Sequence, residues 1–458
     1  MKRWTLLALL GVVSASAACA SILGIESGIL DNGEGGTEAG VQICVADGGD
    51  HPDTSAGIFV YGDVGQDVSN CGDESTPCKT LNYGITKAKG TSGKTTVFVA
   101  VGDSPYNETV KLLSNITVEG GWTVVGSGDK AEWDRVCSFT DATQIATIVG
   151  TESAAVRADD LGGEATLRYL AIRTKVAGPG ESIYGVFASG SSTRVMLDNV
   201  FVEVGVGGPG KPGADGIPGL TGGPSCPIGN AITSPSAEAG VGAQLGTVGA
   251  NGVSPKSATN GESGATGGNG LRGTDGGCIA CLACAGGLGA CSSAPDSCGG
   301  VGKSGCGGGG GGGGAAGGSG GSAVGIYAWA GAVVVVGGKI DVAGGGNGGA
   351  GGNGASGGEG GAGEIGDVAT ACSTSCLNAG LACTATVLST GAGTPGLGTR
   401  GANGSTGGAG GGGAGGYAFG VVSELDASVI VDAGVNVKSG GTGGAPGGAS
   451  GLSSERFP

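Results

Sequence analysis

Two short segments of this chain carry residues that bind phosphate in other proteins, but neither completes the motif. In Val301-Gly302-Lys303-Ser304 the lysine and the serine follow in the right order, yet Ser297 stands where a phosphate-binding loop requires its leading glycine. Gly93-Lys94-Thr95 fails in the same way, because Ala88 occupies the leading position. We therefore expect no bound cofactor.

A cysteine run could support metal chemistry. Cys278, Cys281 and Cys284 have the spacing of an iron–sulfur ligand run, but Leu288 occupies the fourth ligand position. A structural zinc ion bound by these thiolates is an alternative. Disulfides are the favoured interpretation if the chain is exported, and in that case no metal is expected.

The first residues have the composition of an export signal. Lys2 and Arg3 precede the apolar stretch Leu6–Val13, which is too short to span a bilayer, and small residues then lead to Cys19. The pattern resembles a bacterial lipoprotein signal. That resemblance implies removal of a signal peptide at 1–18, lipidation of Cys19 and attachment to a membrane through the lipid.

Two neighbouring residues qualify this prediction. Ser16 stands where lipoprotein signals more often have an aliphatic residue, so simple cleavage and secretion remain an alternative. Ala20 follows the cysteine in place of an aspartate, which implies sorting to the outer membrane or cell surface. Residues 19–56 are acidic, and we expect a flexible tether there.

Cysteine parity fits this oxidising, exported setting. Fifteen cysteines minus the lipidated Cys19 leave fourteen, an even number. The disulfide candidates are Cys44, Cys71, Cys78 and Cys137; then Cys226, Cys278, Cys281, Cys284, Cys291, Cys298 and Cys306; then Cys372, Cys376 and Cys383. The second and third groups are both odd in number. If the first four cysteines pair with one another, at least one bridge must join the other two groups and place their segments side by side.

Composition limits the class of protein. The 458 residues include 112 glycines and only 4% aromatic residues, whereas an average chain has about 7% glycine. The net charge of −16 makes nucleic acid and anionic membrane surfaces poor partners. A compact multi-domain enzyme is therefore not expected.

Three separated pieces of the chain share one strand pattern: a short apolar stretch, a polar break and a second, alternating stretch. They lie at 184–204, 324–342 and 419–437, and glycine-rich tracts divide them. The recurrence predicts successive coils of one β-solenoid. The expected organisation is a β-structured part at 57–204, an insert at 205–322, a coil at 323–342, an insert at 343–416, a coil at 417–438 and a glycine-rich tail at 439–458.

The segment 57–204 gives a more specific indication. A strand pattern and a polar loop are followed by Pro77–Ala88, where Leu81, Ile85 and Ala88 have helical spacing, and then by further strand patterns up to Gly120-Gly121-Trp122. This order resembles the opening of right-handed parallel β-helix (pectin-lyase-like) proteins. The resemblance implies an all-β, right-handed parallel β-helix with large glycine-rich inserts, whose open end the helix caps. An ordinary β-sandwich is the alternative, because alternation alone does not fix parallel pairing.

Within this part, three segments appear in one frame: Leu113–Val118, Leu167–Ile172 and Leu197–Val202. Their alternate aliphatic residues are expected to stack from coil to coil.

The same family includes polysaccharide hydrolases and lyases, but their motifs are not complete here. Asp159-Asp160 could supply paired acids, yet the Gly-His-Gly and Arg-Ile-Lys motifs are missing and the only histidine is His51, in the tether. A lyase needs an arginine base beside calcium-binding acids, and no acid cluster accompanies the arginines of the candidate strands. These are Arg157, Arg168, Arg173 and Arg194. We expect no enzymatic activity.

Glycine recurs at every third residue of the inserts, as from Gly207 to Gly222 and from Gly345 to Gly366. Period three is that of the polyproline II helix, in which a glycine row lets neighbouring backbones approach closely. Three interpretations remain open: a collagen-like triple helix, disorder, and a bundle of antiparallel polyglycine-II helices pinned by disulfides. The bundle is the favoured one.

The whole chain resembles the glycine-rich, PGRS-type surface lipoproteins of myxobacteria. That resemblance implies a surface location and names no substrate. We therefore predict a structural or adhesive surface protein whose partners are the membrane, through its anchor, and cell-surface polysaccharide or neighbouring cells. A carbohydrate-binding module is the alternative, and a divergent polysaccharide lyase a weaker one.

Overall fold

The computed structural model describes residues 51–126, 128–136, 145–226, 236–273, 301–366 and 396–457, and the backbone of 278–279 and 297–298. Contacts divide the chain into Met1–Gly40 and Val41–Pro458, and every described residue belongs to the second unit. The predicted signal peptide 1–18, Cys19 and the tether up to residue 50 lie outside the described residues.

Helix α1, Leu81–Gly90, forms where the sequence predicts it. The Thr80 hydroxyl caps its start by accepting a hydrogen bond from the Tyr83 amide at 3.3 Å, and the Glu108 carboxylate accepts bonds from the first two helical amides. The three apolar residues expected to share one face are buried. In the part of the chain that the structure describes, no helix has the length and apolarity needed to cross a bilayer.

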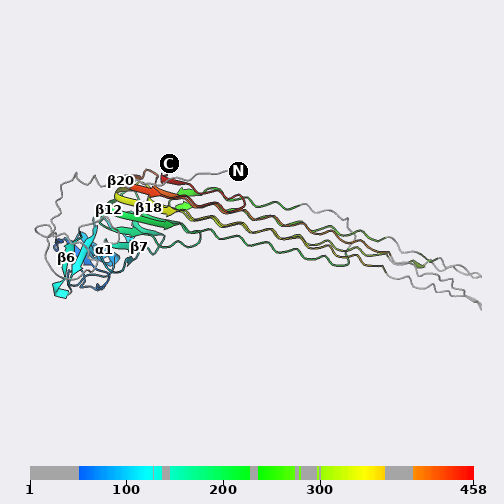
Figure 1. Cartoon of the computed structure of the whole chain (residues 1–458), viewed down its shortest axis with the longest axis horizontal. Coiled ribbons are helices and arrows are strands. Elements are labelled where there is room, and N and C mark those ends of the chain that lie inside the picture. The colour runs from blue at the N-terminus through cyan, green and yellow to red at the C-terminus, as the bar shows by residue number, and fades with distance from the viewer. Residues whose placement is uncertain are drawn as a thin grey trace, which may run out of the picture. The chain divides into compact units, whose positions relative to one another are not determined.

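The described strands form two large sheets, in which almost all pairing is parallel (Figure 1). The larger sheet contains, in spatial order, β1 (Gly57–Val60), β2 (Thr96–Ala100), β5 (Thr117–Val125), β9 (Gly163–Arg168), β12 (Thr193–Val206), β10 (Ala171–Arg173), β7 (Thr147–Val149) and β3 (Tyr106–Asn107), with β18 (Val333–Gly344), β20 (Ser428–Val437) and β6 (Glu132–Arg135) attached off this path. The smaller sheet contains β21 (Ser453–Arg456), β19 (Ala418–Glu424), β17 (Ala323–Trp329), β11 (Ile183–Ser189), β8 (Ala154–Asp159) and β4 (Val110–Lys111).

The remaining elements are short. They are the antiparallel pairs β13 (Thr247–Gly249) with β14 (Gly252–Ser254) and β15 (Cys278–Ile279) with β16 (Ser297–Cys298), and the 3-10 helix η1 (Gly128–Lys130). The chain is therefore all-β with one α-helix in its described part, and the parallel pairing argues against the sandwich alternative.

The three repeated pieces are direct neighbours in both sheets, which confirms the prediction of adjacency. In the smaller sheet β11, β17 and β19 pair in order, with Val186 opposite Ile326 and Ile326 opposite Val421. In the larger sheet β12, β18 and β20 pair in the same order. Aliphatic side chains buried between the sheets thus stack strand over strand, because parallel register places equal residue types one above another.

Tight corners let each smaller-sheet strand lead into a larger-sheet strand. Three residues separate β11 from β12, and three separate β17 from β18. The backbone is left-handed at such corners, with φ of 47° at Asp160 and 55° at Ala330. A second kind of corner has left-handed Tyr169 or Asn199.

The corners correct one prediction. Leu113–Val118 does not share a frame with the other two segments, since Val118 lies opposite Leu167 and not opposite Ile172. The left-handed Asn115 of the first segment belongs to the corner between the sheets, whereas Asn199 belongs to the second corner. The same local pattern, aliphatic residues around a left-handed asparagine, occurs at both kinds of corner. The sequence alone therefore does not distinguish the two kinds.

Two further boundaries differ from expectation. The predicted end at Gly120-Gly121-Trp122 is wrong, because β5 continues to Val125 and turns back to pair antiparallel with β6. The tail 439–458 is not glycine tract throughout, since β21 adds a parallel strand beside β19.

Candidate functional site

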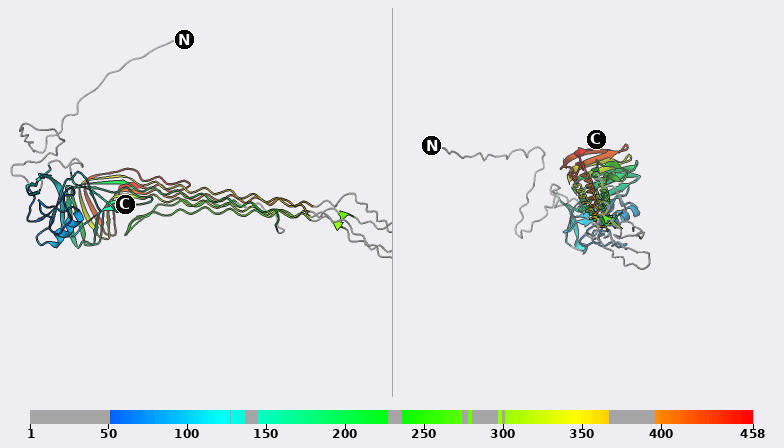
Figure 2. Two further views of the ribbon diagram at one scale, coloured as in Figure 1. Left: turned by 90° about the horizontal axis from the view of Figure 1, so that it is seen from below. Right: turned by 90° about the vertical axis from the view of Figure 1, so that its right-hand side faces the viewer.

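The glycine-rich segments lie side by side and run away from the strand ends, as Figures 1 and 2 show. We call this set the glycine bundle; its segments are 207–223, 236–246, 255–273, 301–322, 345–366, 396–416 and 439–452. In segment 207–223 every third amide from Gly210 to Gly222 donates to a neighbouring segment, as in Gly210 N to Asn347 O at 2.7 Å and Gly213 N to Ala350 O at 2.8 Å. Backbone hydrogen bonds at this period replace both helix and sheet ladders.

Both inserts and the tail contribute to one bundle. Segment 207–223 of the first insert donates to 345–366 of the second, and Gly348 of the second donates to Thr442 O of the tail at 2.7 Å. The two inserts are therefore side by side, as cysteine parity suggested. The disulfide proposed to join them would involve residues outside the described ones.

The expectation of purely antiparallel packing is wrong. Segment 207–223 is antiparallel to 301–322, because Gly309 donates to Leu220 and Gly312 donates to Ile217. It is parallel to 345–366, where the partner numbers rise together. A helix with three residues per turn presents donors and acceptors around its axis, so either direction satisfies them.

Side-chain volume is excluded where segments meet. A Cβ atom built on Gly213 would overlap the carbonyl oxygen of Ala315, and one on Gly352 would overlap that of Ala214. Backbone atoms cannot give way as a flexible side chain can. Glycine at these positions is therefore a packing requirement.

A bundle segment with more neighbouring segments has more rows of glycine. Segment 345–366 has two glycine rows facing neighbours and one exposed row, Asn347, Ala350, Asn353, Ser356, Glu359 and Ala362. The unbroken run Gly307–Gly314 lies in the segment that bonds to 207–223, 255–273, 345–366 and 396–416. The second glycine row is visible in the sequence, with Ala355 as its one interruption between Gly346 and Gly361.

An edge segment tolerates proline for a related reason. In 207–223 the donating amides belong to Gly210, Gly213, Gly216, Gly219 and Gly222. The prolines of this segment fall between them and cost no hydrogen bond, while their fixed φ suits the extended helix. They are Pro209, Pro212 and Pro218.

Three tyrosines attach the bundle to the smaller sheet. The hydroxyl of Tyr184 accepts from Val253 N at 2.8 Å, that of Tyr327 donates to Gly249 O, and that of Tyr417 donates to Gly246 O at 2.7 Å. All three partners lie in or beside the β13–β14 hairpin of the first insert. Burial raises the pKa of Tyr184 and of Tyr417. Sequence reasoning missed this attachment, although a tyrosine in or just before each repeated piece was its signal.

A polar groove of about 480 Å³ lies where strands of the larger sheet end and bundle segments begin. Arg173, Glu203, Asp341 and Asn436 form one row across β10, β12, β18 and β20. Arg173 Nε contacts Glu203 Oε2 at 2.6 Å. Lys339 donates to Asp341 at 2.7 Å, which raises the pKa of the lysine. The groove offers both hydrogen-bond donors and acceptors along its open surface.

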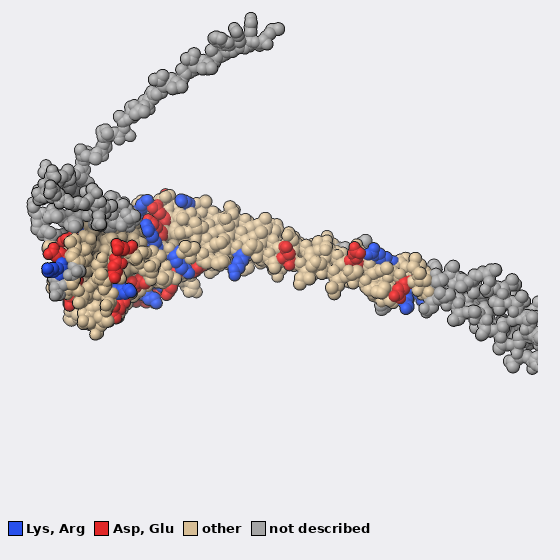
Figure 3. Space-filling view, turned by 60° about the horizontal axis from the view of Figure 1, so that its bottom comes forward, with Lys and Arg blue, Asp and Glu red and all other residues tan. Residues whose placement is uncertain are grey.

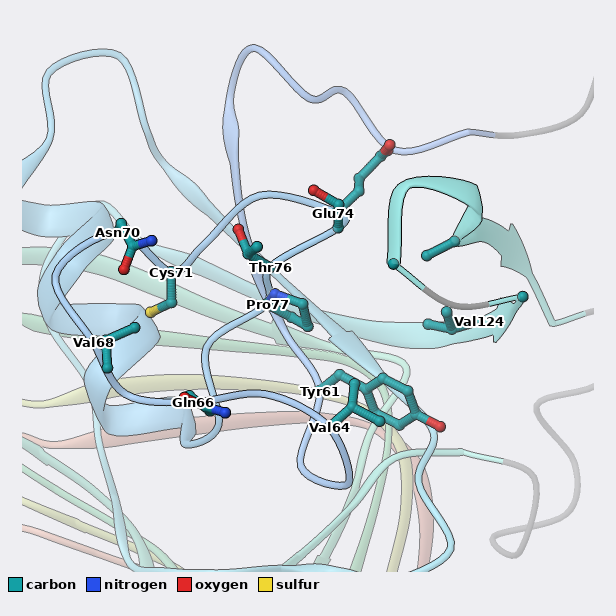
Figure 4. A pocket seen from close by; sticks show the side chains of 14 residues that line it. Tyr61, Val64, Gln66, Val68, Asn70, Cys71, Glu74, Thr76, Pro77 and Val124 are labelled. Carbon is teal, nitrogen blue, oxygen red and sulfur yellow. The ribbon is translucent and has the colours of Figure 1, made fainter.

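A second cleft, of about 590 Å³, lies beside the loop that precedes α1 (Figure 4). Tyr61, Val64 and Pro77 on the loop side and Val124 of β5 give it apolar walls, and the loop adds Gln66, Asn70, Glu74, Ser75 and Thr76. A disulfide between Cys71 and Cys78 braces the loop. Burial, together with nearby carboxylates, raises the pKa of Tyr61.

Of the fourteen disulfide candidates, four are seen paired. Cys71 bonds Cys78, and Cys226 bonds Cys306, each pair with Cα atoms 5.0 Å apart. The backbones of Cys278 and Cys298 pair in β15–β16. The others lie outside the described residues: Cys44, Cys137, Cys281, Cys284, Cys291, Cys372, Cys376 and Cys383. Among the described residues no group of three or more histidine, cysteine or acidic side chains could bind a metal ion.

Three of the four strand arginines form ion pairs with acidic residues. Arg157 pairs with Asp159 at 2.9 Å, and Arg168 lies 3.7 Å from Glu119. Arg173 pairs with Glu203 at 2.6 Å. Arg157 and Asp159 lie two residues apart on β8, whereas parallel register brings Arg168 to Glu119 and Arg173 to Glu203 from separate strands. Arg194 is exposed on β12.

The incomplete phosphate motifs have structural roles. Lys303 lies 3.6 Å from Glu364, and Ser304 donates to Cys226 O within the bundle. Lys94 donates to Thr54 O. His51 is mostly exposed, with its ring nitrogen 3.4 Å from Trp133 O.

No family model, curated protein or solved structure matches this chain.

Proposed function

We propose that this chain is an exported, non-enzymatic surface protein in which a right-handed parallel β-helix displays a polyglycine-II bundle for structural or adhesive contact. The observation that carries the proposal is the single hydrogen-bonded bundle, built from two inserts and the tail, that leaves the ends of stacked strands. Attachment to the outer membrane or cell surface would use a lipid on Cys19.

The surface of the bundle suits repeated weak contacts. Figure 3 shows that charged side chains gather over the strands on the face in view, while the bundle carries few. Its exposed rows hold small polar and aliphatic residues at a fixed spacing, as in the row from Asn347 to Ala362. Many equivalent shallow contacts give avidity where one contact would be weak.

The arginine pairs do not favour a lyase. An arginine that acts as a base must lose its proton, and a neighbouring carboxylate favours the protonated form. Arg157 and Arg173 both have such a neighbour within 3 Å.

The test is display of the full chain on a Gram-negative host that has no adhesin of its own. We expect palmitate incorporation that Cys19→Ala abolishes, and cell clumping that Gly352→Val reduces strongly and Ile430→Ala, at an exposed position of the larger sheet, does not. Surface exposure of all variants is checked with antibody on intact cells. Equal clumping by Gly352→Val at equal exposure would rule out the bundle as the adhesive part.

A carbohydrate-binding module is the second candidate. The polar groove favours it, because Arg173, Glu203 and Asn436 offer hydrogen-bond donors and acceptors in one row, as sugar hydroxyls require.

A further inference from the structure

The outer face of the smaller sheet carries a second row of side chains that the proposals above do not use. Asp159 of β8, Ser189 of β11, Trp329 of β17 and Glu424 of β19 are in register across four adjacent strands. Residues in one register on one face project in the same direction. The row therefore places an indole between polar side chains.

Trp329 differs from the other described tryptophans. Trp122 and Trp133 are 2% and 1% exposed, whereas Trp329 is partly exposed. Its ring is stacked with that of Tyr327, with 6.3 Å between the centroids and 15° between the planes. Tyr327 is in turn stacked with Phe187 at 4.9 Å. The indole is thus held in one orientation by rings beneath it, at low cost in entropy on binding.

The acids beside the indole are arranged to accept hydrogen bonds. Asp159 receives bonds from Arg157 at 2.9 Å and from Ser189 at 2.8 Å, which fix its carboxylate. Glu424 follows Trp329 on the next strand. This set has two carboxylates and one guanidinium, so its net charge is negative.

A pyranose ring has one face of C–H groups and a rim of hydroxyls. The partly exposed indole complements that face, and the carboxylates complement the rim. Because the row is net negative, a uronic acid is disfavoured relative to a neutral sugar.

We propose that the row Asp159–Ser189–Trp329–Glu424 is a binding subsite for a neutral pyranose unit of an extended glycan, with Trp329 as the stacking platform. This inference deepens the carbohydrate-binding candidate and rests on it. The display function does not depend on it.

The experiment is calorimetric titration of the purified mature chain with cellohexaose, chitohexaose and a galacturonic acid hexamer. We expect binding of a neutral hexamer and little binding of the acidic one. Trp329→Ala should weaken binding about tenfold or more, and Trp329→Phe less, because it keeps a ring. Ile430→Ala, at a 58% exposed position of the other sheet, is the matched control. Melting curves verify that each variant is folded.

The outcomes distinguish failure of the Trp329 subsite from failure of the carbohydrate-binding candidate as a whole. Asn436 and Lys438 both line the polar groove. Binding that Trp329→Ala leaves intact but the double substitution Asn436→Ala and Lys438→Ala removes would place the sugar in the groove and overturn the Trp329 subsite. No binding of either neutral hexamer at millimolar concentration would overturn the subsite and the carbohydrate-binding candidate together.

Discussion

The stacked strands and the glycine bundle are stabilised in opposite ways. Between the sheets, aliphatic side chains such as Leu197 and Ile326 are 1% and 0% exposed, and burial of apolar surface is the main favourable term. In the bundle, neighbouring backbones are hydrogen-bonded directly to one another, and most contact positions have no room for even a single Cβ atom. Volume is required in the first region and excluded in the second. Loss of side-chain volume should therefore destabilise the first region, and gain of side-chain volume should destabilise the second.

The largest effect is expected from loss of volume between the sheets. Leu197→Ala should lower the free energy of unfolding by about 2–5 kcal/mol, because it leaves a cavity. Urea unfolding followed by circular dichroism measures this. Arg194→Ala, on an exposed position of the same strand, serves as control and should stay within about 0.5 kcal/mol. Equal effects would mean that packing between the sheets does not stabilise them.

Gain of volume should have the corresponding effect in the bundle. Gly352→Val places atoms against the Ala214 carbonyl and should cost about 1–3 kcal/mol locally, as overpacking does. Amide hydrogen exchange should show loss of protection in 207–223 and 345–366 while the strands stay protected. Ala350→Val, in the exposed row, should leave exchange unchanged. Loss of protection in the strands as well would show that the two regions unfold together.

The same contrast explains which features of the fold and of the candidate site can be predicted from the sequence. Aliphatic alternation and period-three glycine identified the three repeated pieces and the bundle, because each pattern reports a local packing need. Partners set by register were not visible: Arg173 and Glu203 come together only after β10 and β12 pair. Asn115 was misassigned because both corner types use the same local residues. The hydrogen bond from Tyr327 to Gly249 depends on where the long first insert comes back to the sheet. No local sequence pattern encodes that position.

The tyrosine attachment joins the two regions and should have an intermediate effect. Tyr417→Phe removes one hydrogen bond and leaves the carbonyl of Gly246 unpaired, at a cost of about 1 kcal/mol. Faster exchange of the hairpin amides 247–254, with unchanged exchange in β17 and β19, is the expected result. No change in the hairpin would show that packing alone holds it.

Alkaline pH tests the same attachment. The pKa of Tyr184 and of Tyr417 is raised by burial, which favours the neutral phenol in the folded protein. Their contribution to stability is therefore complete below pH about 10, the ordinary tyrosine value, and is lost as pH rises through the higher folded-state pKa. Hairpin exchange, corrected for intrinsic rates, should rise only above pH 10. A rise already near pH 8 would contradict this.

The smallest effect is expected at the edge of the bundle. Pro212→Ala leaves every donating amide of 207–223 in place and acts mainly by increasing the conformational freedom of the unfolded chain. A destabilisation of about 0.4–1 kcal/mol, seen as faster exchange in that segment alone, is expected. A larger loss would indicate that the proline ring makes contacts of its own.

Because each outgoing bundle segment starts where a strand ends, the reach of the bundle is independent of the strand stack. One added triplet lengthens an extended three-residue helix by about 9 Å. A matched triplet inserted in every segment would move the tip of the bundle outward by that amount. The register of the strands, the corners between the sheets and the tyrosine attachment would stay the same. Length is thus a modular property of this protein, adjustable in fixed increments without a new fold.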